Sequence, residues 1–109
     1  MTPVRYGIYL ANLDPTLGRE IAKTRPVVVV SLDAMNAHAG TVVVCPLTTS
    51  LHPTWRSRLA VRCSGKPAEI AVDQIRTVSI LRLTRKIDGL PAEKAARLRE
   101  LIVEMYGLP

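Results

Sequence analysis

The sequence is poor in aromatic residues and in cysteine. Among its 109 residues there is no Phe, one Trp and three Tyr, so the core of a folded domain must consist of aliphatic side chains. Cys45 and Cys63 have neither a C-x-x-C spacing nor a histidine cluster beside them, which argues against a metal site. We expect two reduced, buried thiols of a cytosolic protein, with a disulfide as the less favoured alternative.

Long apolar runs and the motifs of several enzyme classes are also missing. No basic leader precedes an apolar segment and no run approaches ~18 apolar residues, so we expect neither a signal peptide nor a membrane span. The sequence lacks G-x-S-x-G, a P-loop and G-x-G-x-x-G, which argues against α/β-hydrolases, P-loop NTPases and dinucleotide-binding enzymes. His38 and His52 stand apart without metal-ligand spacing, and no metal or cofactor is predicted.

Negative charge is scarce. The chain carries 15 Lys and Arg against 9 Asp and Glu, a formal charge of +6 with a pI near 9.9. Residues 92–106 hold equal numbers of both signs, so the positive excess belongs to the rest of the chain. This bias suits nucleic acid or an acidic protein partner, and a merely basic domain is the alternative. The length fits one domain, residues 1–109, whose modest core would gain from pairing with a second copy.

Short runs rich in Val, Ile and Leu, separated by turn residues, predict a mainly β domain. The valines after Pro26 are too β-branched and too few for a helix, and indicate a strand buried on both faces. We expect a turn or short helix over 33–40, a flexible loop over 48–56 and a turn over 64–67. The predicted strands are 6–13, 26–32, 41–47, 58–62, 69–72 and 86–90.

The last predicted element is an amphipathic helix. Apolar residues recur at helical spacing from Ala95 to Met105, with charged residues on the other faces. Pro91 suits the first helical position, which makes Leu90 an N-cap without a side-chain acceptor, and Gly107 is a natural end. We expect this helix to close one side of a small barrel of strands.

The polar loop before the valine strand holds the first candidate functional residue. Pro15 and Gly18 punctuate this loop, and Arg25 is its last charged residue before the apolar run. A permanent charge at the rim of an aliphatic core calls for an anion. We interpret that anion as a phosphate of RNA, and an Arg25 that pairs with a local carboxylate is an equally good interpretation of the pattern.

Other candidates also have a purely structural interpretation. Thr48 and Thr49 suit an ordinary turn after a strand, and Glu20 is by default solvated. The stretch 73–76, Asp-Gln-Ile-Arg, is also consistent with a structural turn that contains an Asp–Arg pair. Trp55 is slightly favoured as a cap over the open end of the barrel, ahead of a residue that stacks on a base or on a side chain of a partner.

Several short pieces recur in a specific order and spacing from about Tyr6 to Leu108. They are Gly7-Ile8-Tyr9, Leu13-Asp14-Pro15, Gly18-Arg19-Glu20, Lys23 to Val30, Asn36, Pro46-Leu47-Thr48, Asp73 to Thr77 and the terminal helix. Together they resemble the MazF/PemK/Kid family of toxins from type II toxin–antitoxin systems. The resemblance implies a small SH3-like β-barrel (CcdB/Kid/MazF-like) with a C-terminal helix, a homodimer, and metal-independent, sequence-specific cleavage of single-stranded RNA that inhibits translation and growth.

The resemblance also implies the site residues. Arg25 and Thr48 are the implied catalytic pair, and Glu20, with its loop, is the implied substrate contact and candidate base. The expected RNA-binding residues are Arg19, Lys23, Thr24, Thr49, Ser50, Gln74 and Arg76. The family often has Ser and Gln where this chain has Arg19 and Ile21, so we expect a changed base preference.

Cleavage without a metal uses the 2′-OH of the substrate as nucleophile and leaves a 2′,3′-cyclic phosphate and a 5′-OH. Arg25 would stabilise charge on the phosphate, Thr48 would donate one more hydrogen bond, and solvent is the fallback base. The expected protein partner is an antitoxin with an acidic, partly disordered segment. The alternatives are a CcdB-like gyrase-inhibiting toxin and a non-catalytic RNA-binding barrel.

Overall fold

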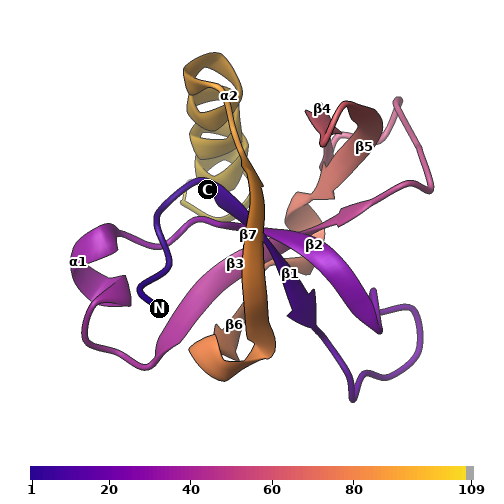
Figure 1. Ribbon diagram of the computed structural model, residues 1–109. Helices are drawn as coiled ribbons and strands as arrows, with labels where there is room; N and C mark the ends of the chain where they lie inside the picture. The colour runs from indigo at the N-terminus through magenta and orange to yellow at the C-terminus, as the bar shows by residue number, and fades with distance from the viewer. Residues whose placement is uncertain (108–109) are drawn as a thin grey trace.

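The computed structural model describes residues 1–107, so Leu108, the last residue of the predicted similarity, lies outside them. Within these residues one curled antiparallel sheet forms a half-barrel in the order β4-β5-β3-β2-β1-β7, and β6 pairs with β3 (Figure 1). The strands are β1 (Gly7–Asn12), β2 (Thr24–Val29), β3 (Thr41–Thr48), β4 (Arg58–Cys63), β5 (Lys66–Ala71), β6 (Arg76–Ser79) and β7 (Leu83–Gly89). The predicted mainly β fold with a C-terminal helix is confirmed.

The valine strand is buried on both faces, as predicted. Val28 and Val30 join a core cluster with Leu98 and Leu101 of the terminal helix. Val27 and Val29, which point the other way, join a second cluster that β1, β3, β6 and β7 complete. Alternation along a strand sends successive side chains to opposite faces, and the curl of the sheet lets both faces exclude water.

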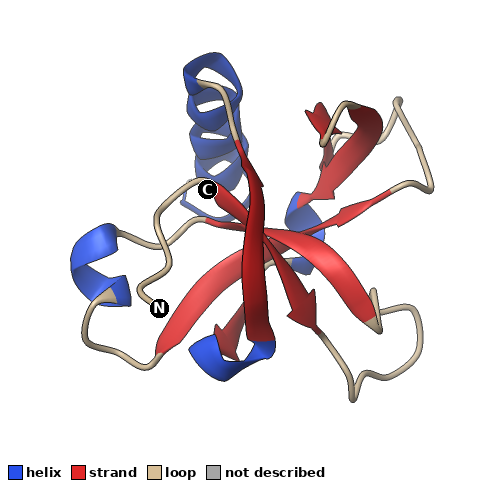
Figure 2. Ribbon diagram, viewed as in Figure 1, coloured by secondary structure: helices blue, strands red, loops and turns tan. Residues whose placement is uncertain are grey.

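Two helices and three short turns complete the structure. The helix α1 (Asp33–Asn36) fulfils the expectation of a short helical excursion. The helix α2 (Ala92–Ile102) stands on one side of the strands (Figure 2). Its N-cap is Pro91 rather than the predicted Leu90, because the Pro91 carbonyl accepts the first helical N–H, from Ala95. The turns are η1 (Val72–Gln74), η2 (Ile80–Arg82) and η3 (Val103–Gly107).

Strands β2, β5 and β7 differ from the predicted 26–32, 69–72 and 86–90 by two residues or more at one end or both, and β6 was not predicted. The hairpin between β4 and β5 turns on Ser64 and Gly65 alone, both with positive φ, as a tight two-residue turn requires. Pro67 therefore lies in β5, beyond the part that pairs with β3. Strand β6 was missed because only Val78 among its four residues is buried. The first residues of β7 were missed because most side chains of that strand are exposed and give no apolar pattern.

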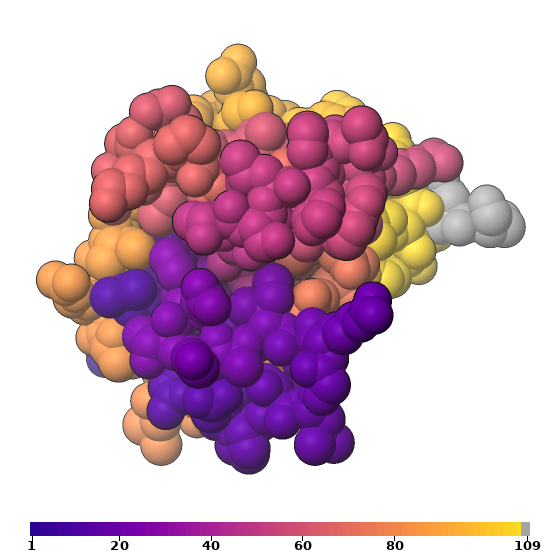
Figure 3. Space-filling model, turned by 90° about the vertical axis from the view of Figure 1, so that its right-hand side faces the viewer, coloured from indigo at the N-terminus to yellow at the C-terminus, as the bar shows by residue number. Residues whose placement is uncertain are grey.

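Two loops of the half-barrel lie on one face of the molecule. The β1–β2 loop, residues 13–23, and the β3–β4 loop, residues 49–57, face the viewer together in Figure 3. The first lies just before Arg25 and the second just after Thr48. In the part of the chain that the structure describes, no helix is long and apolar enough to cross a membrane.

Candidate functional site

Arg25 and Thr48 line one pocket of about 220 Å³, which we call the Arg25–Thr48 pocket. Strands β2 and β3 bring them together, because their antiparallel register pairs Val27 with Pro46. The same register, continued past the last paired residues, sets Arg25 opposite Thr48. The other lining residues are Pro26, Leu47, Thr49, Cys63, Ser64, Lys66, Pro67, Ala68 and Ile87. The pocket thus has an apolar floor and a polar rim.

The guanidinium of Arg25 is exposed and only partly engaged. Its Nε donates to the carbonyl of Ala22 at 3.3 Å. Within residues 1–107 no carboxylate lies within 4.0 Å of it, since the ion pairs found there involve other residues. The alternative of a local carboxylate partner therefore fails, and the terminal nitrogens of Arg25 can bind an anion through two parallel hydrogen bonds.

Thr48 has its hydroxyl fixed from one side. Its Oγ1 accepts the N–H of Ser50 at 3.1 Å, a local turn of the kind that Thr favours after a strand. A hydroxyl has one proton and two acceptor lone pairs, so this bond leaves the proton of Thr48 available. The residue can donate to a group that enters the pocket.

Lys66 is a second cation in the Arg25–Thr48 pocket, and sequence reasoning missed it. It reaches the pocket through the β4–β5 hairpin, whose tip is tied to β7 by a hydrogen bond from Ser64 N–H to Asp88 Oδ2 of 2.8 Å. The N–H groups of Ser64 and Gly89 lower the pKa of Asp88, because both stabilise the ionised carboxylate. In the part of the chain that the structure describes, the charged residues that line this pocket are Arg25 and Lys66, and both are cations.

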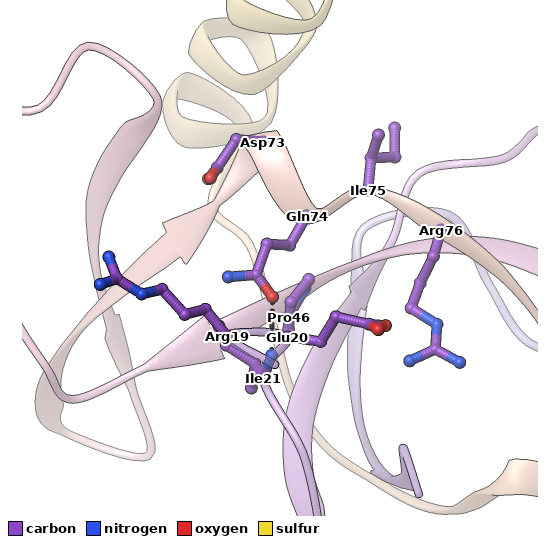
Figure 4. Close-up of a pocket in the computed structure, with 8 residues that line it drawn as sticks. All are labelled: Arg19, Glu20, Ile21, Pro46, Asp73, Gln74, Ile75 and Arg76. Atoms are coloured by element: carbon purple, nitrogen blue, oxygen red, sulfur yellow. Dashed lines mark hydrogen bonds between the residues drawn. The ribbon is translucent and has the colours of Figure 1, made fainter. Parts of the chain in front are cut away.

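Glu20 lies in a different pocket, which we call the loop pocket. Its volume is about 510 Å³, and its lining residues are Arg19, Glu20, Ile21, Pro46, Asp73, Gln74, Ile75 and Arg76. In Figure 4 Arg19 extends to one side of Gln74, and Glu20 and Arg76 lie on the other side. Glu20 is exposed, and its Oε1 accepts the N–H of Leu17 at 2.9 Å. The predicted catalytic set is thus divided between two pockets, of which β3 lines one with Pro46 and the other with Leu47 and Thr48.

Two predicted RNA-binding residues hold the β1–β2 loop in place. The Oε1 of Gln74 accepts the N–H of Ile21 at 2.7 Å (Figure 4), and Arg76 Nη1 donates to the carbonyl of Leu13 at 3.4 Å. This contact uses the side-chain oxygen of Gln74 and not its amide nitrogen. Both residues therefore fix the shape of the loop while lining the loop pocket.

The other predicted RNA-binding residues flank the two pockets. Thr49 lines the Arg25–Thr48 pocket, and Ser50 is exposed directly after it. Lys23 and Thr24 are exposed at the start of β2. Lys23 has a positive φ of 66°, and its N–H donates to Asp14 Oδ1 at 3.0 Å. This bond fixes the backbone and leaves the ammonium of Lys23 at the surface.

A buried ion pair underneath the β3–β4 loop was also missed. Arg58 Nη1 lies 3.0 Å from Glu69 Oε1, and their side chains are only 8% and 3% exposed. The same Nη1 donates to the carbonyl of Ser50 at 2.9 Å, and the same Oε1 accepts the N–H of His52 at 2.9 Å. Opposite charges in two predicted strands were the only signal of this pair in the sequence.

Trp55 does not belong to either core cluster and is 49% exposed. Its ring stacks on His52 with the ring centroids 3.7 Å apart, and the Arg58 guanidinium lies 5.0 Å from the Trp55 ring centroid. The structure therefore shows Trp55 packed within its own loop rather than as a cap over the barrel. This stack also gives His52 a structural contact that the sequence analysis did not foresee.

Both cysteines are free thiols. Cys45 is buried in the core that contains α2, and burial, with the nearby charge of Asp73, raises its pKa to about 12. Cys63 is half-buried, and burial raises its pKa as well. Because Cys63 also lines the Arg25–Thr48 pocket, it reports on access to that pocket.

Comparisons with known proteins agree with the sequence resemblance. Residues 4–106 match the sequence profile of the family described as PemK-like, MazF-like toxin of type II toxin-antitoxin system. Endoribonuclease MazF9 of Mycobacterium tuberculosis is 30% identical over 104 aligned residues, which cover 87% of this chain and 88% of the relative.

Solved structures with the same fold include MazF (Form-I) of Deinococcus radiodurans, with a TM-score of 0.86, 23% identity and 99% of each chain covered. The toxin MazF-mt6 of Mycobacterium tuberculosis has a TM-score of 0.79 at 25% identity, with 94% of this chain and 98% of that chain covered. An endoribonuclease of a mycobacterial species in complex with its cognate antitoxin has a TM-score of 0.78 at 22% identity, covering 99% and 96%.

Proposed function

The chain belongs to the PemK/MazF family of toxins of type II toxin–antitoxin systems, and from this premise we propose that it is a sequence-specific endoribonuclease that cuts single-stranded mRNA without a metal. Cutting mRNA stops translation and so inhibits growth. The working place of such an enzyme is the cytoplasm, where its substrate is found. Residues 1–109 act as a single toxin domain, built around one continuous sheet.

The observation that carries the proposal is the composition of the Arg25–Thr48 pocket. Its two charged residues, Arg25 and Lys66, are cations from different elements, and Thr48, whose hydroxyl proton is not used in the bond with the Ser50 N–H, lines the same pocket. Among residues 1–107 no carboxylate side chain lines this pocket. Such a site favours a phosphate group over a cation or a neutral ligand, and its apolar floor suits the ribose and base attached to that phosphate.

The chemistry follows from these donors. The 2′-oxygen forms a bond to phosphorus and loses its proton, while the bond from phosphorus to the 5′-oxygen breaks and that oxygen gains a proton. Arg25 and Thr48 stabilise the charge that grows on the phosphate oxygens. Arg25 stays protonated and is a poor base. We assign proton removal to Glu20, whose loop also supplies the Ala22 carbonyl that holds Arg25, with water as the alternative acceptor.

The loop pocket serves base recognition in this proposal. It offers guanidinium donors from Arg19 and Arg76 and the amide nitrogen of Gln74, and Asp73 supplies an acceptor. Donors and acceptors of this kind discriminate between bases on their edges. The cation of Arg19 and the apolar Ile21 change this set relative to a loop with Ser and Gln, so we infer an altered base preference.

The proposed partners are a second copy of the chain and a cognate antitoxin with an acidic, partly disordered segment. The net charge of +6 supports an acidic partner. A mycobacterial endoribonuclease that shares the fold has been solved with its cognate antitoxin. The small aliphatic core supports pairing between copies.

The test is cleavage of a long single-stranded RNA in the presence of EDTA by the wild type and by Arg25→Gln. The matched control is Arg85→Gln, which removes the same charge from an exposed position on β7 outside both pockets. We expect Arg25→Gln to lose about 10²–10³ in rate and the control to cut like the wild type. No fragments from the wild type on any RNA would instead support a CcdB-like gyrase inhibitor or, if RNA binds, a non-catalytic RNA-binding barrel.

A further inference from the structure

We propose that the buried pair of Arg58 and Glu69 positions the hydroxyl of Thr48 for catalysis, acting through the backbone of Ser50. The inference rests on the proposed function, because Thr48 is a catalytic residue only in that function. Arg58 and Glu69 themselves touch no substrate, so they are positioning residues.

The first step is the link between the pair and Ser50. Arg58 Nη1 donates both to Glu69 Oε1, at 3.0 Å, and to the Ser50 carbonyl, at 2.9 Å. A guanidinium is a rigid planar fork, so Glu69 fixes the direction from which Arg58 holds the Ser50 peptide. Glu69 of β5 lies directly opposite Thr48 of β3 in the antiparallel pairing of these strands, so the ion pair and the Thr48 hydroxyl belong to neighbouring residues of the sheet.

The second step is the link between Ser50 and Thr48. The N–H of Ser50 donates to Thr48 Oγ1 at 3.1 Å. This bond occupies one acceptor site of the hydroxyl and directs its proton elsewhere. A Ser50 peptide held on its carbonyl by Arg58 and bonded through its N–H to Thr48 therefore fixes the rotation of the hydroxyl over the pocket.

The third step is the fixing of the rest of the loop. Glu69 Oε1 also accepts the N–H of His52, and the His52 ring stacks on Trp55, which lies beside the Arg58 guanidinium. The ion pair thus holds the loop at two backbone positions, His52 through Glu69 and Ser50 through Arg58. The Nε of Arg58 is buried without a hydrogen-bond partner among the described residues. Burying a charge pair and an unpaired N–H seldom improves stability over apolar residues, which points to a positional role for the pair.

The experiment replaces the pair by Arg58→Met with Glu69→Gln, which leaves no unpaired charge in the interior. The same double change is made in a Thr48→Val background, where no hydroxyl remains to be positioned. The matched control is Arg56→Met in the same loop, because the Arg56 side chain is 87% exposed and its one ion-pair partner within residues 1–107 is Glu104, at 4.0 Å. Each variant is assayed for kcat and KM on one single-stranded RNA.

We expect the pair replacement to lower kcat by about 10- to 100-fold with little change in KM, as for a catalytic group that is slightly misplaced. In the Thr48→Val background the same replacement should leave kcat within about twofold. Loss of folded protein or a general loosening would instead reduce both backgrounds by the same factor. That result, or an unchanged kcat in the wild-type background, would overturn the inference.

A second measurement does not depend on cleavage. Hydrogen exchange of the Ser50 amide should accelerate about tenfold in the pair variant, because its bond to Thr48 is no longer held in place. Arg58→Lys, which keeps the charge but lacks the fork, replaces the pair variant in both assays if that variant does not fold. If the wild type cuts no RNA, the proposed function fails; unchanged Ser50 exchange overturns the positioning role even if the wild type cuts RNA.

Discussion

Glu69→Gln should be one of the most destabilising single substitutions in this chain. The change keeps the size of the side chain and an oxygen that can accept from His52, but it removes the charge opposite Arg58. The Arg58 side chain is 8% exposed, so its cation would stay in the interior without a counter-charge. Breaking a buried ion pair in this way costs about 3–5 kcal/mol.

A second Arg–Glu pair in the chain, with the same distance between nitrogen and oxygen, serves as a control for Glu69→Gln. Arg97 Nη1 lies 3.0 Å from Glu100 Oε2 on α2, but these side chains are 45% and 65% exposed. An exposed pair of this kind contributes about 0–0.5 kcal/mol, because water screens it and two flexible side chains lose freedom. Glu100→Gln should therefore be nearly neutral. The Arg–Glu distance is the same in the two pairs, so burial accounts for most of the difference between the variants; Arg97 also keeps Glu104 Oε1, at 3.5 Å, as a second partner.

The measurement is urea unfolding followed by circular dichroism at one fixed protein concentration, which keeps any contribution from self-association constant. A domain of this length has a total stability of about 5–15 kcal/mol, so Glu69→Gln should remove a large part of it and lower Tm by roughly 15–25 °C. Pairing it with Arg58→Met should restore most of the loss. Equal effects of Glu69→Gln and Glu100→Gln would refute the reasoning.

Three further predictions concern the Arg25–Thr48 pocket and the hairpin contact beside it. Lys66→Gln should lower the salt dependence of binding to an uncleavable 2′-O-methyl strand by about 0.7 in slope, whereas Lys94→Gln on α2 should not; equal slopes for both variants would remove Lys66 from the phosphate site. The pKa of Asp88 is lowered in the folded state, so its contribution to stability is present above its unfolded pKa of about 3.9 and is lost as the pH falls through the lower folded value. Asp88→Asn should thus cost about 0.5–1 kcal/mol at pH 7 and less as the pH falls toward 2, as measured by urea unfolding; a difference that stays constant over this range would contradict this. In native protein a thiol-alkylating reagent should modify Cys63 well before Cys45, whose pKa is about 12, and bound 2′-O-methyl strand should protect Cys63; mass spectrometry of the labelled peptides checks both points.

The parts of the fold that local patterns determine were predictable from the sequence. The valines of β2 favour a strand through their own stiffness, and their uninterrupted run indicates burial on both faces. The spacing of Leu98 and Leu101 gives α2 its apolar face. Arg25 marks the end of a polar loop and Thr48 the end of a strand, so both candidates were visible as single residues.

The contacts between distant strands were not predictable from one sequence. Lys66 reaches the pocket because Ser64 and Gly65 make a two-residue turn that Asp88 ties to β7. The burial of Glu69 depends on the register that sets it opposite Thr48. A shift of one residue would turn either side chain to the other face of the sheet, and only the assembled sheet fixes that register.

The most direct test of the proposed chemistry is a single 2′-deoxy substitution in an RNA strand. The cleaved position is first found by sequencing the 5′ ends of fragments from a long RNA. A short strand with 2′-deoxyribose at that position alone should bind but resist cleavage, while the all-ribose strand is cut and leaves a 2′,3′-cyclic phosphate. Cleavage of the 2′-deoxy strand at that bond would contradict attack by the substrate's own 2′-OH on a phosphate held by Arg25 and Thr48.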